Sequence, residues 1–180
     1  MTQRPVARRV HILAMLMIAG TTACVVPPPL ALDEPDAGLN GVPTILSVRL
    51  ADGKELAEEP AVVDLQVGAD NATMTVYDSD LGDTLYVQVF VDYDKNGSTP
   101  PRSHCNAPPS PTNAAERSAS CPMVAVCGAD DTTTNPHRLL VEVYDREPLI
   151  NGSPVFRAVL PPGQSTPRTF SLNCLAATAR

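Results

Sequence analysis

Apolar and polar residues alternate over short stretches of the chain, which is the pattern of half-buried β-strands. The clearest stretch is residues 84–93, where every second residue from Leu85 to Tyr93 is apolar or aromatic. We expect this stretch to be a central strand. Residues 138–144 repeat the design, with three aliphatic side chains facing inward and Glu142 facing outward. The two strands are predicted to pack against each other across the core.

Six shorter stretches with β-branched or alternating residues complete the predicted strands: 44–50, 61–67, 73–77, 124–127, 155–160 and 169–174. Turn residues separate them, and outside the first 23 residues only 113–120 predicts a short helix. Seven or eight strands over residues 43–180 predict an all-β fold. We expect an antiparallel β-sandwich, immunoglobulin-like in general shape.

Residues 95–120 interrupt this pattern, because they contain five prolines and little that predicts a strand. A loop of this length in a compact domain is either functional or without fixed structure. We interpret it as a place where a partner binds, or as an insertion pinned by a disulfide.

The first 23 residues have the composition of a targeting segment. They begin with three arginines and no acid, continue with an apolar run over 10–20 broken by His11, and end in the small residues 21–23. This is the order of a secretory signal peptide. The apolar run is about half of the roughly 20 residues that a membrane-spanning helix needs, so a permanent transmembrane anchor is not expected.

A cysteine follows the small residues directly, in the sequence Thr22-Ala23-Cys24. Here the chain resembles a bacterial lipoprotein precursor, although Thr21 stands where such lipoboxes usually carry an aliphatic residue. The resemblance implies that Cys24 is joined to diacylglycerol and becomes the acylated amino terminus. Because Val25 is not the Asp that retains lipoproteins in the inner membrane, it also implies the outer membrane of a Gram-negative host. The alternative is an ordinary signal peptide, which leaves Cys24 as a free thiol.

Residues 24–42 are rich in proline and acidic residues and show no periodicity. This composition favours an extended, semi-rigid tether between the lipidated cysteine and the folded domain at 43–180. The formal net charge is −7, and removal of residues 1–23 takes away three arginines and no acid. Since phosphate binding needs a basic face, nucleic acid is not an expected partner.

Four more cysteines follow in the predicted domain, and an exported chain forms disulfides by default. Four cysteines allow three pairings. We favour Cys105 with Cys121, which closes the proline-rich stretch, and Cys127 with Cys174, which ties the last strand back. Zinc is the alternative, but the spacing supplies no Cys-x-x-Cys pair.

One motif has the residue types of a metal site. Residues 92–97 match the first half of a calcium loop, with Asp92, Asp94 and Asn96 at alternate positions before a glycine. The second half does not match, because Ser103 stands where a bidentate Glu belongs. The calcium hypothesis therefore rests on these three residues, and the plain alternative is a turn after a strand.

No catalytic motif accompanies these features, so we predict a protein that is not an enzyme and holds no cofactor other than the hypothetical calcium. The sequence indicates a lipid-anchored structural or binding module of the cell envelope, with an envelope protein or a glycan as its partner. One alternative is a calcium-dependent adhesion or carbohydrate-binding domain. A second is a freely secreted hydrolase with a dispersed site.

Overall fold

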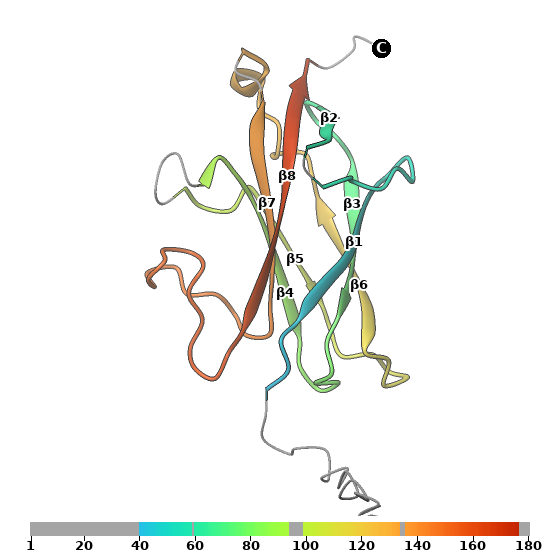
Figure 1. Ribbon diagram of the computed structural model, residues 1–180, viewed down its shortest axis with the longest axis vertical. Helices are drawn as coiled ribbons and strands as arrows, with labels where there is room; N and C mark the ends of the chain where they lie inside the picture. The colour runs from blue at the N-terminus through green and yellow to red at the C-terminus, as the bar shows by residue number, and fades with distance from the viewer. Residues whose placement is uncertain (1–39, 59, 94–98, 134–135, 177–180) are drawn as a thin grey trace, which may run out of the picture. The chain divides into compact units, whose positions relative to one another are not determined.

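A computed structural model of the protein describes residues 40–58, 60–93, 99–133 and 136–176, which form two facing β-sheets (Figure 1). The smaller sheet contains β1 (Thr44–Leu50), β3 (Asn71–Tyr77) and β6 (Glu116–Pro122). The larger sheet contains β2 (Val62–Gln66), β4 (Leu85–Val91), β5 (Ser103–Ala107), β7 (His137–Tyr144) and β8 (Ser165–Leu175). A 3-10 helix, η1 (Ala129–Thr133), precedes β7. The predicted signal peptide, Cys24 and residues 24–39 of the predicted tether lie outside the described residues.

The order of the strands gives the fold its class. The smaller sheet runs β1-β3-β6 and the larger β2-β8-β7-β4-β5. Neighbours are antiparallel except for β2 and β8, which are parallel. This matches the immunoglobulin arrangement, in which strands A, B and E share one sheet and G, F and C the other, with β5 in the place of the additional C′ strand. The predicted all-β sandwich of immunoglobulin-like shape is confirmed.

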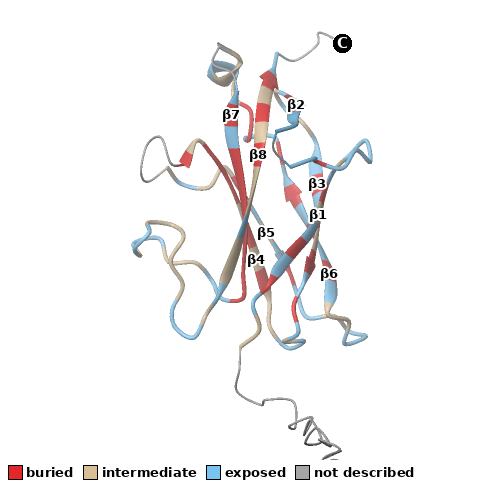
Figure 2. Cartoon of the chain, viewed as in Figure 1, coloured by how far each residue is buried: buried red, intermediate tan, exposed pale blue. Residues whose placement is uncertain are grey.

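The core lies between the sheets and is built from alternate positions of the strands (Figure 2). On β4, the side chains from Leu85 to Val91 that were predicted to share a face are all buried. On β3, Met74 and Val76 are fully buried, and on β8 so is Phe170. Each such side chain contributes about 1.5–3 kcal/mol to folding through the removal of apolar surface from water.

A β-bulge near the start of β1 sets which of its residues face the core. The register with β3 shifts between Ile45 and Ser47, so Ile45 and Val48 are both buried although they are three residues apart. Arg168 on β8 donates from Nη1 to the carbonyl oxygens of Ile45 and Leu46, at 3.1 and 2.9 Å. The bulge therefore also links the first strand to the opposite sheet.

The predicted packing of residues 84–93 against 138–144 across the core is wrong. β4 and β7 are hydrogen-bonded neighbours in one sheet, with Val89 opposite Val141. The alternation of apolar residues identifies the buried face of each strand, but it does not identify the strand beside it.

The long loop predicted over residues 95–120 is also wrong in its described part, because it contains β5 and most of β6. The inward positions of β6 are Arg117, Ala119 and Cys121, and those of β5 include Ser103. A strand whose buried positions hold charged or small side chains lacks the alternation of large apolar residues that predicts a strand. The short helix predicted over 113–120 is wrong for the same reason.

Two predicted strands are not formed. Residues 124–127 make a turn after β6, and residues 155–160 belong to the connection between β7 and β8. Phe156 in this connection has a φ of 62°, which β-structure does not allow. A single bridge between Leu149 and Ala158 is the pairing that the connection makes.

Both disulfides have the pairing that the sequence analysis favoured. Cys105 on β5 bonds to Cys121 on β6, with Cα atoms 5.0 Å apart, and so joins the two sheets at one edge. Cys127 bonds to Cys174 on β8, with Cα atoms 5.6 Å apart. The second disulfide ties the last strand to the turn that follows β6.

Candidate functional site

The connection between β7 and β8, residues 145–164, folds back over the outer face of the five-stranded sheet (Figure 1). Under it, Phe90, Tyr93 and Leu140 form a small second core, against which Phe156 of the connection packs. The Tyr93 hydroxyl donates to the carbonyl oxygen of Val155 at 2.6 Å. An outer face that usually meets solvent is therefore partly covered by its own chain.

A partly buried ion pair holds the same connection. Arg157 donates from Nε to Oε2 of Glu142 at 2.5 Å, and the Ser165 hydroxyl donates to Oε1 of Glu142 at 2.9 Å. Glu142 points away from the main core as predicted, but it is buried under the connection. Burial by itself lowers the pKa of Arg157, yet the hydrogen bond and charge of Glu142 raise it above its usual value. Burial is the largest cause of a raised pKa at Tyr144, and the charge of the nearby Glu142 raises this pKa further.

The connection stops short of β5 and leaves an open depression beside it, which we call the outer groove. Its volume is about 500 Å³, within the roughly 300–1,000 Å³ typical of small-molecule sites. The floor consists of outward side chains of β4 and β5, and the walls come from residues 100–101 and from the connection. The lining residues are Tyr86, Val87, Gln88, Pro100, Pro101, His104, Asn106, Glu147, Pro148, Ile150 and Phe156.

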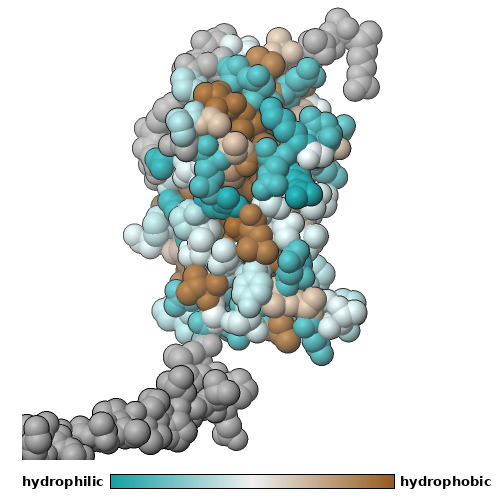
Figure 3. All heavy atoms as spheres, turned by 45° about the vertical axis from the view of Figure 1, so that its right-hand side comes forward, coloured by the Kyte–Doolittle hydropathy of each residue, from teal (hydrophilic) through white to brown (hydrophobic). Residues whose placement is uncertain are grey.

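Other parts of the surface offer less. On the face turned forward in Figure 3, hydrophobic side chains lie in separate patches among hydrophilic ones. Scattered exposed apolar residues of this kind are normal for a folded domain. A second depression, of about 370 Å³, lies near the ends of β1, β2 and β8 and is lined by Asp52, Asp64 and Asp70 without an aromatic residue. The outer groove combines aromatic rings with several polar side chains, whereas this second depression has no aromatic ring.

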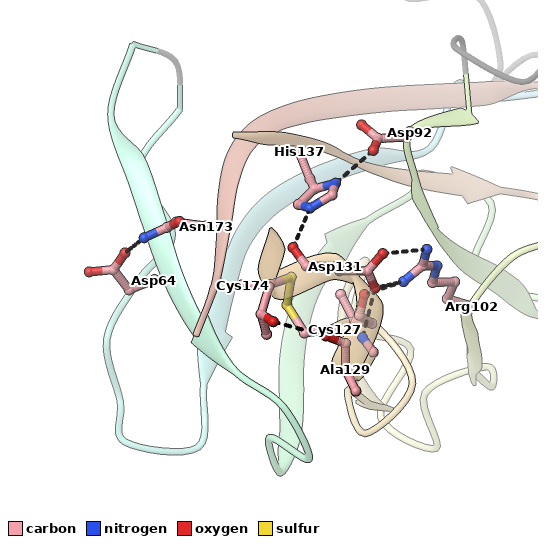
Figure 4. Close-up of a disulfide and its surroundings, with 12 residues drawn as sticks. Asp64, Asp92, Arg102, Cys127, Ala129, Asp131, His137, Asn173 and Cys174 are labelled. Carbon is pink, nitrogen blue, oxygen red and sulfur yellow. Dashed lines mark hydrogen bonds and ion pairs between the residues drawn. A yellow bond between two sulfur atoms is a disulfide. The ribbon is translucent and has the colours of Figure 1, made fainter. Parts of the chain in front are cut away.

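His137 forms a polar network near the Cys127–Cys174 disulfide (Figure 4). Its Nδ1 lies 2.6 Å from Oδ2 of Asp92, and its Nε2 lies 2.7 Å from the carbonyl oxygen of Asp131. Both ring nitrogens therefore lie within hydrogen-bond distance of an oxygen atom. The buried ring therefore ties the start of β7 to the end of β4 and to η1.

Asp131 connects this network to the turn before β5. Its carboxylate forms an ion pair with Arg102 and accepts the backbone N–H of Gly128 at 2.7 Å. The hydrogen bond from Arg102 lowers the pKa of Asp131 below its usual value, although burial acts in the opposite direction. The network stabilises three loops at one end of the sandwich and leaves His137 without a role that requires substrate.

Of the three residues in the calcium hypothesis, the structure describes Asp92. Asp94 and Asn96 lie outside the described residues. Asp92 has a left-handed backbone, with φ of 52°, and its two carboxylate oxygens already accept hydrogen bonds. Oδ2 is bonded to His137 and Oδ1 accepts the backbone N–H of Arg138 at 2.9 Å. Asp92 thus has a structural role as a cap on the end of β4.

A second group of acids, Asp78, Asp80 and Asp83, lies in the turn between β3 and β4 with carboxylate oxygens within 4.8 Å of one another. Arg117 fills this turn. It donates to the carbonyl oxygens of Asp80 and Asp83, and its Nη2 lies 3.7 Å from Oδ2 of Asp78. Burial raises the pKa of Asp78, which is fully inaccessible. A guanidinium therefore already supplies positive charge to these acids.

A comparison with known protein families finds none that matches the chain, and a comparison with curated proteins finds none that is similar to it. Arguments about function therefore rest on the residues themselves. The two disulfides indicate an oxidising, exported environment. Among the described residues, no helix has the length and apolar character needed to cross a membrane.

Sequence reasoning did not anticipate the outer groove. The sequence pattern assigns Pro100, Pro101 and His104 to a long loop and Phe156 to a strand, so it does not bring them together. The available signal was Tyr86 and Gln88, which lie on the outward side of the strongest strand. An aromatic ring at an outward position next to an amide is a weak indication until the neighbouring strand is known.

Proposed function

We propose that this protein is an exported lipoprotein, anchored through Cys24, whose sandwich is a non-catalytic ligand-binding module of the cell envelope. The anchor is supported by one observation, the sequence Thr22-Ala23-Cys24 directly after an apolar run. The two disulfides agree with an exported protein. Several acyl chains on one residue hold a protein at a membrane, whereas a single chain binds weakly.

The binding role is supported by the outer groove. A sheet face that carries aromatic and hydrogen-bonding side chains, with a wall that the protein's own chain builds beside it, has the composition of a ligand site. The polar groups around His137 and Arg117, by contrast, form hydrogen bonds with neighbouring loops of the domain itself.

The anchor is tested by the intact mass of the protein extracted from membranes, with Cys24→Ser as the comparison. We expect cleavage before Cys24 and the added mass of acyl chains in the wild type, and neither in the variant. Thr21→Leu restores the aliphatic residue that lipoboxes usually carry, so it should be lipidated at least as completely as the wild type. An unlipidated wild-type mass would make this a freely exported protein.

The outer-membrane location is tested separately by fractionation of Gram-negative envelopes. Val25→Asp places the retention residue directly after the anchor and should move the protein to the inner-membrane fraction. The matched control is Val26→Asp, one position further on, which should leave it in the outer membrane. Wild-type protein in the inner-membrane fraction would contradict this part of the proposal.

A further inference from the structure

We propose that the outer groove binds a neutral saccharide, an inference that rests on the proposed function of a ligand-binding module and names its ligand class. Four outward side chains form the floor as two opposed pairs across neighbouring strands. Tyr86 on β4 lies opposite Asn106 on β5, and Gln88 lies opposite His104. Directly opposed residues on one face lie close enough to contact a single small ligand.

This floor has the chemistry that sugar rings need. The Gln88 and Asn106 amides each offer a donor and an acceptor, and His104 offers one of each when neutral. Vicinal hydroxyl groups also donate and accept in pairs. The ring of Tyr86 presents a flat apolar face beside these groups, on which the C–H side of a pyranose can lie.

The walls are apolar and stiff. Pro100, Pro101 and Pro148 have fixed φ angles, and they face the groove together with Ile150 and Phe156. Ile150 is 68% exposed and so offers an apolar surface to a ligand. Phe156 holds a left-handed backbone conformation that is strained for a bulky residue, and such conformations are often found at binding sites. Stiff walls reduce the entropy that a ligand site loses on binding.

An unpaired buried acceptor lies in the floor. Oε1 of Gln88 is shielded from solvent and has no hydrogen-bond partner among the described residues. Buried polar atoms nearly always have partners, so an unpaired one at the base of a groove points to a missing donor. A hydroxyl group of a bound sugar can supply that donor after a small rotation of the side chain.

The charge of the groove selects against anions. Among the described residues that line it there is one acid, Glu147, and no lysine or arginine. The whole chain is also acidic, with a formal net charge of −7. Phosphorylated, sulfated or uronic ligands therefore lack a cationic partner, and a neutral or N-acetylated sugar fits better.

An extended peptide is a poorer occupant. Strand addition needs a free sheet edge, and β5, the last strand of its sheet, lies beside β6 and is bonded to it through Cys105 and Cys121. A proline-rich peptide would use the apolar walls, but it has few donors for Gln88 because proline lacks a backbone N–H.

The test uses the full-length protein extracted from membranes in a detergent without a sugar headgroup. Maltohexaose, cellohexaose and chitohexaose are the neutral probes, an oligogalacturonate is the acidic probe, and a decaproline peptide represents the peptide class. Titration calorimetry gives the Kd for each. We expect at least one neutral oligosaccharide to bind, and Tyr86→Ala and Asn106→Ala each to weaken its binding at least tenfold. Tyr77→Ala is the matched control, because Tyr77 is 45% exposed on the other sheet.

Each other outcome has a definite meaning. Binding of only the oligogalacturonate or only decaproline, weakened by Tyr86→Ala, would overturn the saccharide assignment and leave a ligand-binding module in place. Saccharide binding that survives both floor variants would show that the site is elsewhere. No binding of any probe at millimolar concentration would overturn both the saccharide and the binding role, while lipidation would still be decided by the mass measurement. Thermal unfolding by circular dichroism confirms that each variant is folded.

Discussion

Arg157 and the buried Glu142 form a partly buried ion pair on the outer side of the larger sheet, with Nε and Oε2 2.5 Å apart. The guanidinium also lies over the ring of Tyr93, 5.1 Å from its centroid. These contacts fix the β7–β8 connection on β4 and β7. The connection in turn supplies one wall of the outer groove. The ion pair therefore stabilises the position of that wall.

We expect Arg157→Met to lower the free energy of unfolding by about 3 kcal/mol, because it leaves the Glu142 carboxylate buried without its partner. Glu142→Leu combined with Arg157→Leu removes both charges and should recover most of the loss. Urea titration followed by circular dichroism measures the free energy of unfolding of the single and the double variant. If the double variant were less stable than Arg157→Met, the pair would act through packing and not through charge.

Arg117→Met should also destabilise the fold by about 3–5 kcal/mol, since Arg117 is the cation beside the inaccessible Asp78. Arg49→Met is the matched control. Arg49 pairs with Glu55 at 3.4 Å on the surface, with about half of each side chain exposed, and such pairs contribute only about 0–1 kcal/mol. Equal midpoints for the two variants in urea would contradict a structural role for Arg117.

The two disulfides should differ in their contribution to stability. They close stretches of 47 residues for Cys127–Cys174 and 16 residues for Cys105–Cys121. A loop-entropy estimate gives about 4 kcal/mol for the longer and about 3 kcal/mol for the shorter. Paired Cys→Ala variants, compared by chemical denaturation, should therefore rank in that order. The reverse order would indicate that contacts between β5 and β6 depend on the shorter disulfide.

Asp131 predicts a pH dependence. Its pKa in the fold is lower than the value of 3.8 for the free side chain, chiefly because Arg102 donates to it. A lowered folded pKa means that the carboxylate stabilises the fold above about pH 4 and that this contribution is lost as the pH falls through the folded pKa. Asp131→Asn should therefore be less stable than wild type at pH 7.

The difference between Asp131→Asn and wild type should narrow below pH 4. Thermal unfolding at several pH values measures it, with Asp70→Asn as the control at an exposed position of the turn between β2 and β3. A constant difference from pH 7 to pH 2 would show that the Asp131 charge contributes nothing to stability.

The strands could be predicted where their buried positions hold large apolar residues. Residues 85–91 and 138–144 show their inward faces by period-2 alternation, and both form strands. Tyr93, expected on the same face as Leu85, instead lies beyond β4 in the second core. β5 and β6 were missed because their buried positions hold Ser103, Arg117 and Ala119. Which strands become neighbours depends on long-range pairing that alternation does not encode.

The site was predictable only in fragments. Of the three possible cysteine pairings, the favoured one closes the proline-rich stretch and ties the last strand back, and the structure confirms it. Prediction of the outer groove from the sequence would have required two facts about the arrangement of distant segments, which local patterns do not contain. One is that β5 lies beside β4, and the other is that the connection after β7 folds back over the sheet.

Asn40 closes the β7–β8 connection at its base. Its side-chain amide donates to the Asp145 carboxylate and to the carbonyl oxygen of Pro162, which lie at the two ends of the connection. Asn40 lies four residues before the start of β1. The start of the domain and the base of the loop that walls the outer groove therefore share one hydrogen-bonded residue.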